Sequence, residues 1–487
     1  MKPNAQIIIT IYLLFFLVAC SPLKEAKEQA DSLPEIYPDY TSAAIPCNIA
    51  PLNFGVEGVQ HIQAAFSVEG DRQLVVKGKA DVQIPLKKWR KLLDAAKGKQ
   101  LEVTVSVWDD NHPDGLRYQP FTLYVAPEPI DSHIAYRLIE PGYEGWNVMG
   151  IYQRDLTSFE EKAIATNRKD KTRCMNCHEF NHYSPREFLF HVRGEGGGTA
   201  LYDGNTIRKI AFDRQPPYIN ASLPAWHPRG RYIAFASSTS RQVFFSEGEQ
   251  ALEAFSTRGD LMIYDRQTNR LLTDERFVGE RAWEDFPAWS ADGKFLYFCV
   301  ARPQELPQAY KQVRYNLCRV GFDEQTGQLQ AKVDTLYDAD KQGGSVVFPT
   351  ESPDGRYLLY TKSAYGSFPI FWHNEARLEM IRLTDGQQVD TSVWDSERSE
   401  SYHAWSSNSR WVLISSRRVD GNYTRVFIAY MDEVGRLYKP FMLPQRKPKD
   451  DVLRLKSYNL PKFVQGEVTL PRGQLDALFF STARTKR

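Results

Sequence analysis

The chain has 487 residues, of which 61 are basic and 60 acidic, giving a formal net charge of +1. This near balance lacks the charge excess of nucleic-acid-binding proteins, so we expect no nucleic-acid partner. Aromatic residues make up 13% of the chain, a proportion typical of stacked β-sheets and not of disordered chain. The composition therefore predicts a globular, β-rich protein with more than one domain.

Residues 1–19 have the pattern of a secretory signal peptide. One basic residue precedes an apolar run of about 13 residues, which is too short to cross a bilayer as a helix. The run ends in Leu17-Val18-Ala19-Cys20, which resembles the lipobox of bacterial lipoproteins. That resemblance implies a lipid anchor at Cys20 and a location outside the cytoplasm, facing the periplasm from the outer or the inner membrane. The alternative is an ordinary secretory signal with a coincidental cysteine.

Two segments follow the predicted anchor. Residues 20–44 are polar with alternating charges and are expected to be a tether. Residues 45–126 contain short alternating runs separated by Gly, Asp and Asn, which predict a small β-sandwich-like domain. Within it, apolar residues at helical spacing predict one helix over 86–96, whose basic side chains face solvent or an acidic partner.

Residues 127–185 are predicted to be a connector that carries a cofactor. They contain Cys174-Met175-Asn176-Cys177-His178, the C-x-x-C-H pattern of covalent c-type haem attachment. In that chemistry the two thiols bond to the porphyrin, and the histidine binds the iron. A plain dithiol or half of a zinc site are the alternatives, but no second pair of zinc ligands follows at the usual spacing. The sequence therefore predicts one haem c held by Cys174, Cys177 and His178.

The ligand on the other face of the iron stays open. Met149 would give a His/Met cytochrome, and His191 would give a bis-histidine site. An iron with one free position is the third alternative. Three further histidines on or near repeat turns are more often structural: His227, His373 and His403.

From residue 186 to 487 one unit recurs about every 60 residues. The four copies begin at Pro224-Ala225-Trp226, Pro287-Ala288-Trp289, Pro349-Thr350-Glu351 and His403-Ala404-Trp405. Each continues through a turn of the Pro-Asp-Gly type into an apolar strand, which together with a further hairpin makes one four-stranded propeller blade. Hairpins near 188–210 and 475–481 bring the expected number to about six, with the last blade closed by strands from both ends of the region. The third copy departs from the pattern because Glu351 stands where Trp is usual.

These Pro-x-Trp-Ser-Pro-Asp-Gly units resemble the β-propeller repeats of the TolB family. The arrangement as a whole is similar to a group of Bacteroidetes lipoproteins loosely described as TolB-like or cytochrome c biosynthesis proteins. The TolB-like match covers about residues 185–487 and implies a β-propeller there. Together with the patterns described above, it leads us to expect a mostly β chain with a small N-terminal β-sandwich, a haem-bearing connector and a C-terminal propeller. We also expect a redox or envelope protein as a partner.

No nucleophile, metalloprotease or phosphate-binding motif occurs in the chain. The sequence therefore favours electron transfer by a membrane-anchored monohaem c-type cytochrome, with the propeller as the docking domain for a redox partner. The alternative is a propeller scaffold or sensor that binds an envelope protein or glycan, with the haem structural or redox-sensing. A haem enzyme is the least favoured hypothesis. Pairing of Cys299 with Cys318 is left open.

Overall fold

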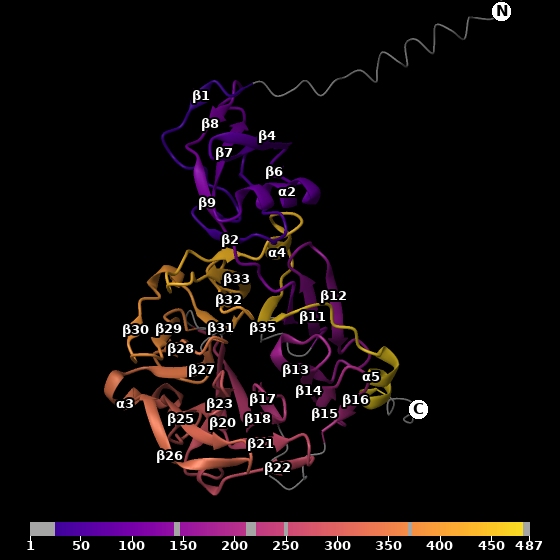
Figure 1. Cartoon of the computed structure of the whole chain (residues 1–487), viewed down its shortest axis with the longest axis vertical. Coiled ribbons are helices and arrows are strands. Elements are labelled where there is room, and N and C mark those ends of the chain that lie inside the picture. The colour runs from indigo at the N-terminus through magenta and orange to yellow at the C-terminus, as the bar shows by residue number, and fades with distance from the viewer. Residues whose placement is uncertain (1–24, 141–146, 211–220, 248–251, 369–372, 481–487) are drawn as a thin grey trace, which may run out of the picture.

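A computed structural model of the chain describes residues 25–140, 147–210, 221–247, 252–368 and 373–480. A small N-terminal domain stands on one edge of a larger ring of sheets (Figure 1). The predicted signal peptide and Cys20 lie outside the described residues. None of the helices within the described ranges has the length and apolar character that a membrane crossing needs.

The N-terminal domain is built around one seven-stranded mixed sheet. Its strands are β1 (Glu28–Gln29), β2 (Ala44–Pro46), β4 (His61–Val68), β5 (Asp71–Gly78), β7 (Gln100–Trp108), β8 (Leu116–Arg117) and β9 (Phe121–Ala126). The long strand β7 pairs with β4 on one side and with both β8 and β9 on the other, so the sheet forks at β7. A two-stranded pair, β3 (Phe54–Gly55) with β6 (Asp81–Val82), completes the domain. The observed domain is thus a forked sheet and not two separate facing sheets.

The helix α2 (Leu86–Ala96) occupies the residues that the sequence predicted. Its apolar face is buried against the sheet, where Trp89 meets Phe66 edge to face with ring centroids 6.1 Å apart. The indole N–H of Trp89 donates to the Ile49 carbonyl at 3.0 Å, which satisfies the polar group of a fully buried ring.

The ring is a six-bladed β-propeller, because six four-stranded antiparallel sheets follow one another around it. Blade 1 contains β10 (His133–Ile139), β11 (Gly150–Asp155), β12 (Glu161–Thr166) and β35 (Ser457–Val464). Blade 2 contains β13 (Cys174–Phe180), β14 (Phe188–Arg193), β15 (Gly198–Tyr202) and β16 (Ile207–Lys209). Blade 3 contains β17 (Ala221–Trp226), β18 (Tyr232–Ser237), β21 (Leu261–Asp265) and β22 (Arg270–Leu272). The prediction of a mostly β chain with about six blades is confirmed.

The remaining blades follow in chain order. Blade 4 contains β23 (Trp283–Trp289), β24 (Phe295–Ala301), β25 (Tyr315–Asp323) and β26 (Gln328–Tyr337). Blade 5 contains β27 (Ser345–Glu351), β28 (Tyr357–Ser363), β29 (Arg377–Arg382) and β30 (Gln388–Val389). Blade 6 contains β31 (Glu400–Trp405), β32 (Trp411–Ser416), β33 (Arg425–Tyr430) and β34 (Phe441–Met442).

Short elements connect or decorate the blades. A hairpin of β19 (Thr239–Phe244) and β20 (Leu252–Arg258) is inserted between β18 and β21. The short helices are η3 (Asn181–Tyr183), η4 (Glu275–Phe277), η5 (Tyr310–Gln312), α3 (Ala339–Gln342), η6 (Ser392–Trp394), α4 (Asp450–Leu453) and α5 (Arg472–Phe479). The hairpin expected near residues 475–481 is therefore wrong where it is described, because α5 occupies most of it.

The two ends of the propeller meet in blade 1. The C-terminal strand β35 pairs antiparallel with β10, with Ile134 opposite Phe463, and lies innermost in the sheet. Figure 1 shows this yellow strand beside the purple strands of the same blade. Strands from two distant parts of the chain thus close one blade, as expected, but it is the first blade and not the last, and three of its strands lie before the predicted propeller region 186–487. The region predicted as a connector, 127–185, instead supplies β10 to β12 of blade 1 and the innermost strand of blade 2.

Residues 156–160 form the turn of the hairpin between β11 and β12. Asp155 accepts hydrogen bonds from the backbone N–H and the hydroxyl of Thr157, both at 2.8 Å, and from the Ser158 hydroxyl at 2.6 Å. These residues have the composition of a helix N-terminus, but the same side chains also close tight turns. Strand pairing on both sides therefore decides between the two conformations.

The N-terminal domain rests on blade 6 through polar and apolar contacts. Asp131 in the segment between the domains accepts hydrogen bonds from Ser407 at 2.6 and 2.8 Å. The Trp411 indole N–H donates to the Glu128 carbonyl at 3.3 Å, and one hydrophobic cluster runs from the domain into β32 and β33. We infer that the domain and the propeller share a continuous core.

Candidate functional site

The C-x-x-C-H pattern forms the innermost strand of blade 2. Strand β13 pairs with β14 up to Asn176 and again from Glu179, so Cys177 and His178 form a bulge between the two paired stretches. Cys177 has a φ of 49°, a left-handed conformation that residues other than glycine seldom adopt. The pattern is therefore built into the propeller and does not lie on a separate connector.

All six inner strands carry the same two-residue bulge at the same register. Its first residue has a positive φ in every blade: Cys177 (49°), Leu223 (49°), Phe286 (55°), Phe348 (56°), Tyr402 (45°) and Leu460 (49°). Its second residue is proline in four blades and histidine in two: Pro224, Pro287, Pro349, Pro461, His178 and His403. The last two residues of C-x-x-C-H thus occupy positions that every blade of the propeller repeats.

His178 and His403 make equivalent contacts. The Nε2 atom of His178 lies 3.4 Å from the Ala135 carbonyl of blade 1, and that of His403 lies 3.1 Å from the Leu359 carbonyl of blade 5. In each case the carbonyl belongs to the second strand of the preceding blade, opposite the residue that resumes pairing after the bulge. Burial lowers the pKa of both imidazoles to about 3, so both are neutral. His178 therefore has the same position and the same kind of contact as His403, which has no cysteines beside it.

The other predicted haem residues lie in two different places. Cys174 Sγ and Met149 Sδ lie 3.4 and 3.8 Å from the same atom, Nη2 of Arg137. All three side chains are at least nine-tenths buried. His191 hydrogen-bonds through Nδ1 to the Thr199 hydroxyl at 3.0 Å, and burial lowers its pKa to about 4. The structure thus brings Met149 to Cys174, but it places His191 against the neighbouring strand β15.

The three haem-attachment residues do not face one common space in this conformation. Cys174 contacts Arg137 and His178 contacts Ala135, whereas Cys177 and His178 line the central cavity without Cys174. A porphyrin bonded to both thiols and to the imidazole needs all three on one side. Within the described ranges, no three His, Cys, Asp or Glu side chains are grouped as metal ligands would be. As placed, these residues do not fit a haem.

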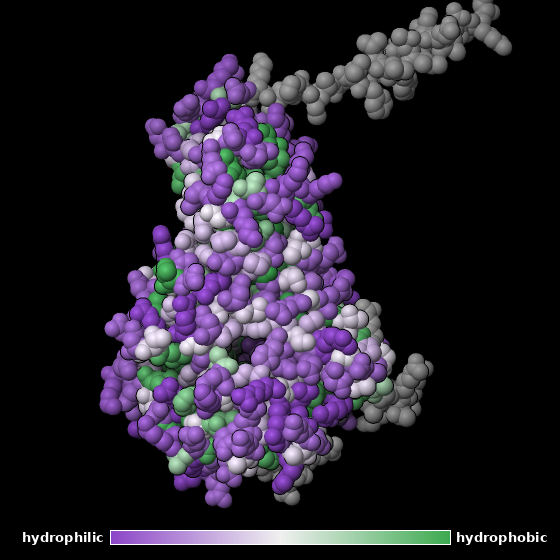
Figure 2. Space-filling model, viewed as in Figure 1, coloured by the Kyte–Doolittle hydropathy of each residue, from purple (hydrophilic) through white to green (hydrophobic). Residues whose placement is uncertain are grey.

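A central cavity of about 330 Å³ opens between the blades (Figure 2). Its wall consists of the inner-strand bulges and of the residues that follow them, which end each inner strand. The bulge residues line its inner end, and the turns after the inner strands surround its mouth. The sequence analysis did not predict this cavity. The repeat could have located it, because the same positions of every copy face the propeller axis.

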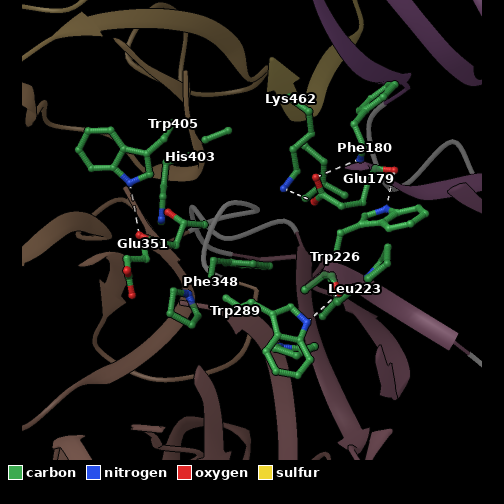
Figure 3. Close-up of a pocket in the computed structure, with 18 of the residues that line it drawn as sticks. Glu179, Phe180, Leu223, Trp226, Trp289, Phe348, Glu351, His403, Trp405 and Lys462 are labelled. Atoms are coloured by element: carbon green, nitrogen blue, oxygen red, sulfur yellow. Dashed lines mark hydrogen bonds and ion pairs between the residues drawn. The ribbon is translucent and has the colours of Figure 1, made fainter. Parts of the chain in front are cut away.

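Three tryptophans tie the mouth of the cavity together. Each donates its indole N–H to a carbonyl of the preceding blade: Trp226 to Glu179 at 3.3 Å, Trp289 to Ala225 at 3.1 Å, and Trp405 to Thr350 at 3.3 Å. Figure 3 shows Trp405 on one side of the cavity and the other two tryptophans on the opposite side. These links join neighbouring blades around the mouth and satisfy the buried N–H group of each of the three indoles.

Glu351 of blade 5 occupies the position that tryptophan has in blades 3, 4 and 6, and it also bonds to the preceding blade. Its carboxylate accepts hydrogen bonds from the Tyr297 hydroxyl at 2.6 Å and from the Ala291 backbone N–H at 3.0 Å, both in blade 4. A second charged group at the mouth, Glu179, pairs with Lys462 of blade 1 at 2.5 Å (Figure 3). The charged groups of the mouth are thus fixed by partners in neighbouring blades.

The two cysteines of blade 4 lie on opposite faces of their sheet. Cys299 packs into the cluster facing blade 5, and Cys318 packs into the cluster facing blade 3. Cys318 stands opposite Phe298, one residue out of register with Cys299. The two thiols are free, so the open question of their pairing is answered against a disulfide.

Comparison with known proteins yields no matching family and no matching curated protein. Among solved structures, a protein described as TolB from Agrobacterium tumefaciens is 12% identical, covering 68% of this chain and 98% of its own, with a TM-score of 0.37. An oligogalacturonate lyase in complex with manganese is 15% identical, covering 63% and 73%, with a TM-score of 0.36. A puromycin-hydrolysing peptidase of Mycobacterium tuberculosis is 13% identical, covering 56% and 39%, with a TM-score of 0.35. The six-bladed architecture is therefore assigned from strand pairing.

Proposed function

We propose that this chain is a lipid-anchored propeller of the cell envelope that docks a protein partner at the mouth of its central cavity. The cavity carries the proposal, because its wall is apolar in part, is fixed by links between blades, and has its charged groups already paired. Preorganised concave sites with a few oriented polar groups are the usual places for ligand binding. No catalytic constellation lines this cavity among the described residues, which favours binding over catalysis.

A photo-crosslinking residue at position 288 tests this proposal. Ala288 lines the cavity, whereas Lys332 lies on β26, the outermost strand of the same blade, and is exposed. In cells, the probe at position 288 is expected to give a discrete adduct with one envelope protein, and a probe at position 332 is expected not to. Adding Ala225→Arg, which projects a charged side chain into the cavity, should abolish the adduct. An adduct that forms equally at both positions, or that survives the blocked cavity, would contradict docking there.

The C-x-x-C-H spacing favours a second function, electron transfer by one covalently attached haem c. Cys174, Cys177 and the neutral imidazole of His178 supply the donor types that attachment requires. Because the three side chains face different neighbours, attachment would require β13 to leave its pairing with β14 around Asn176. No path for an electron follows from the present arrangement.

An absorption spectrum of the unfolded protein tests haem attachment directly. The chain would be produced together with c-haem maturation proteins and compared with the double variant Cys174→Ser/Cys177→Ser. A haem that stays on the denatured chain and is lost in the double variant would support the cytochrome. Denatured chain of unmodified mass would leave the propeller as a docking protein without haem.

A further inference from the structure

A second hollow, a groove of about 500 Å³, lies on the N-terminal domain. Gln63 and Ala65 of β4 line it, whereas the next residue, Phe66, packs against Trp89 of α2. Successive side chains of a strand point to opposite faces of a sheet. The groove therefore lies on the face of the seven-stranded sheet that α2 leaves open.

One row of side chains crosses the groove from strand to strand. Strand pairing puts Lys77 of β5 opposite Gln63. It also puts Ser106 of β7 opposite Gln63 on one side and opposite Arg117 of β8 on the other. Ser106 and Ala65 are short and buried, so they form the floor between the longer side chains. The row is thus low in the middle and basic at both ends.

The groove has an excess of positive charge. Three basic side chains and one acidic side chain line it: Arg72, Lys77, Arg117 and Glu25. Neither Arg72 nor Arg117 has an ion pair or a side-chain hydrogen bond with a described residue. A guanidinium group binds phosphate through two parallel hydrogen bonds, and the Gln63 amide adds a further donor. The lining therefore fits a phosphate group better than it fits a cation or an apolar chain.

The groove also lies close to the predicted lipid anchor. Glu25 lines it, and Cys20 stands five residues earlier in the chain. Five residues of chain span at most about 18 Å. A lipid on Cys20 would therefore hold the groove within that distance of the phospholipid headgroups. Figure 1 shows β1 and β8 at the end of the domain away from the propeller, so the propeller does not separate the groove from the membrane.

We propose that this groove binds the phosphate groups of anionic phospholipids in the membrane that holds the anchor. The proposal rests on the lipid anchor proposed above, but it depends neither on docking at the central cavity nor on haem attachment. A bound headgroup gives the chain a second attachment to the membrane. Two attachments fix the orientation of the protein on the surface, which one lipid-modified residue leaves free.

Sedimentation with vesicles tests the site. The mature chain from residue 21, produced without lipid, is mixed at low salt with phosphatidylcholine vesicles that contain phosphatidylglycerol or lack it. Binding is expected to be stronger when phosphatidylglycerol is present. Arg72→Gln and Arg117→Gln should each weaken it about fivefold, the effect of one basic side chain at an anionic membrane surface. Arg72 is exposed, so its variant tests the site even if Arg117→Gln does not fold.

The double variant Lys87→Gln/Lys88→Gln is the matched control. Both lysines are exposed on α2, which covers the other face of the sheet, so their loss should change vesicle binding little. Equal losses in the control and the groove variants, or no binding to phosphatidylglycerol vesicles, would overturn the proposal. Saturable binding of sodium phosphate without vesicle binding would assign the groove to a free anion and overturn the lipid source. Because the chain used carries no lipid, these outcomes are distinct from failure of the anchor, which Cys20→Ala tests in cells.

Discussion

Replacing His178 with proline should leave the propeller folded. Proline occupies the equivalent bulge position in four of the six blades, each time after a residue with positive φ. The substitution removes the hydrogen bond from His178 to the Ala135 carbonyl, which is long at 3.4 Å and contributes about 1 kcal/mol or less. Proline also restricts the unfolded chain. This restriction stabilises the folded state by about 0.4–1 kcal/mol and so offsets the loss of the hydrogen bond. The net change in the free energy of unfolding is therefore expected to stay within about 1 kcal/mol.

Thermal unfolding of the mature chain, produced without haem, measures this change. A shift of 1 kcal/mol moves the midpoint of a large domain by about 2–4 °C, so His178→Pro should melt within that range of the wild type. Leu189→Pro is the matched control, since Leu189 lies on the adjacent strand and pairs with Glu179 on one side and Leu201 on the other. Proline there breaks strand pairing and should cost about 3 kcal/mol or more. Equal loss of stability in the two variants would refute the equivalence of the six bulges.

Three further outcomes are expected. Burial lowers the pKa of His373, but its hydrogen bonds and ion pairs with Glu253 and Glu375 outweigh burial and raise it to about 9. The protonated imidazole therefore stabilises the fold fully below about pH 6.5, and this stabilisation is lost as the pH rises through 9. Denaturation midpoints should fall over that range, and His373→Gln should abolish this fall. Burial raises the pKa of Asp285 to about 7, so Asp285→Asn should raise the thermal midpoint at pH 8 relative to wild type and change it little at pH 5. Finally, Cys20→Ala should move the chain from the membrane fraction to the soluble fraction after fractionation; retention in the membrane would count against the lipid anchor.

The repeat made most of the propeller predictable. Trp226, Trp289 and Trp405 recur with proline or histidine two residues before them, and the turn that follows each is polar, so strand and blade could be assigned from pattern. Blades 1 and 2 were harder to assign. Their inner strands have Phe463 and Phe180 at the position that Trp holds in blades 3, 4 and 6, and the inner strand of blade 1 comes from the far end of the chain. Pairing between such distant segments leaves no local pattern in the sequence.

The site was less predictable than the fold, because its contacts join different blades. The thioether of Met149 makes it a candidate iron ligand, and the structure does bring it near Cys174, but through a shared contact with Arg137. No spacing rule links residue 137 to residues 149 and 174. The sequence predicts a structural role for His403, and its hydrogen bond to the Leu359 carbonyl agrees with that role. The same contacts at His178 could have been anticipated by aligning Cys177-His178 with Tyr402-His403.

The equivalence of Cys177-His178 with Tyr402-His403 provides a test that distinguishes a docking propeller from a cytochrome. A bulge strand requires Cys177 to hold a positive φ and His178 to face Ala135, whereas haem attachment requires both thiols and the imidazole to face one porphyrin. Both requirements fall on the same residues and cannot be met together in the observed pairing. His178→Pro separates them, because it keeps the bulge and removes the only nitrogen of the pattern that can bind iron. If the variant folds like the wild type and the wild type, produced with maturation proteins, carries no haem, the pattern is a propeller strand. If the wild type carries haem that the variant loses, β13 must adopt a second conformation in the mature protein.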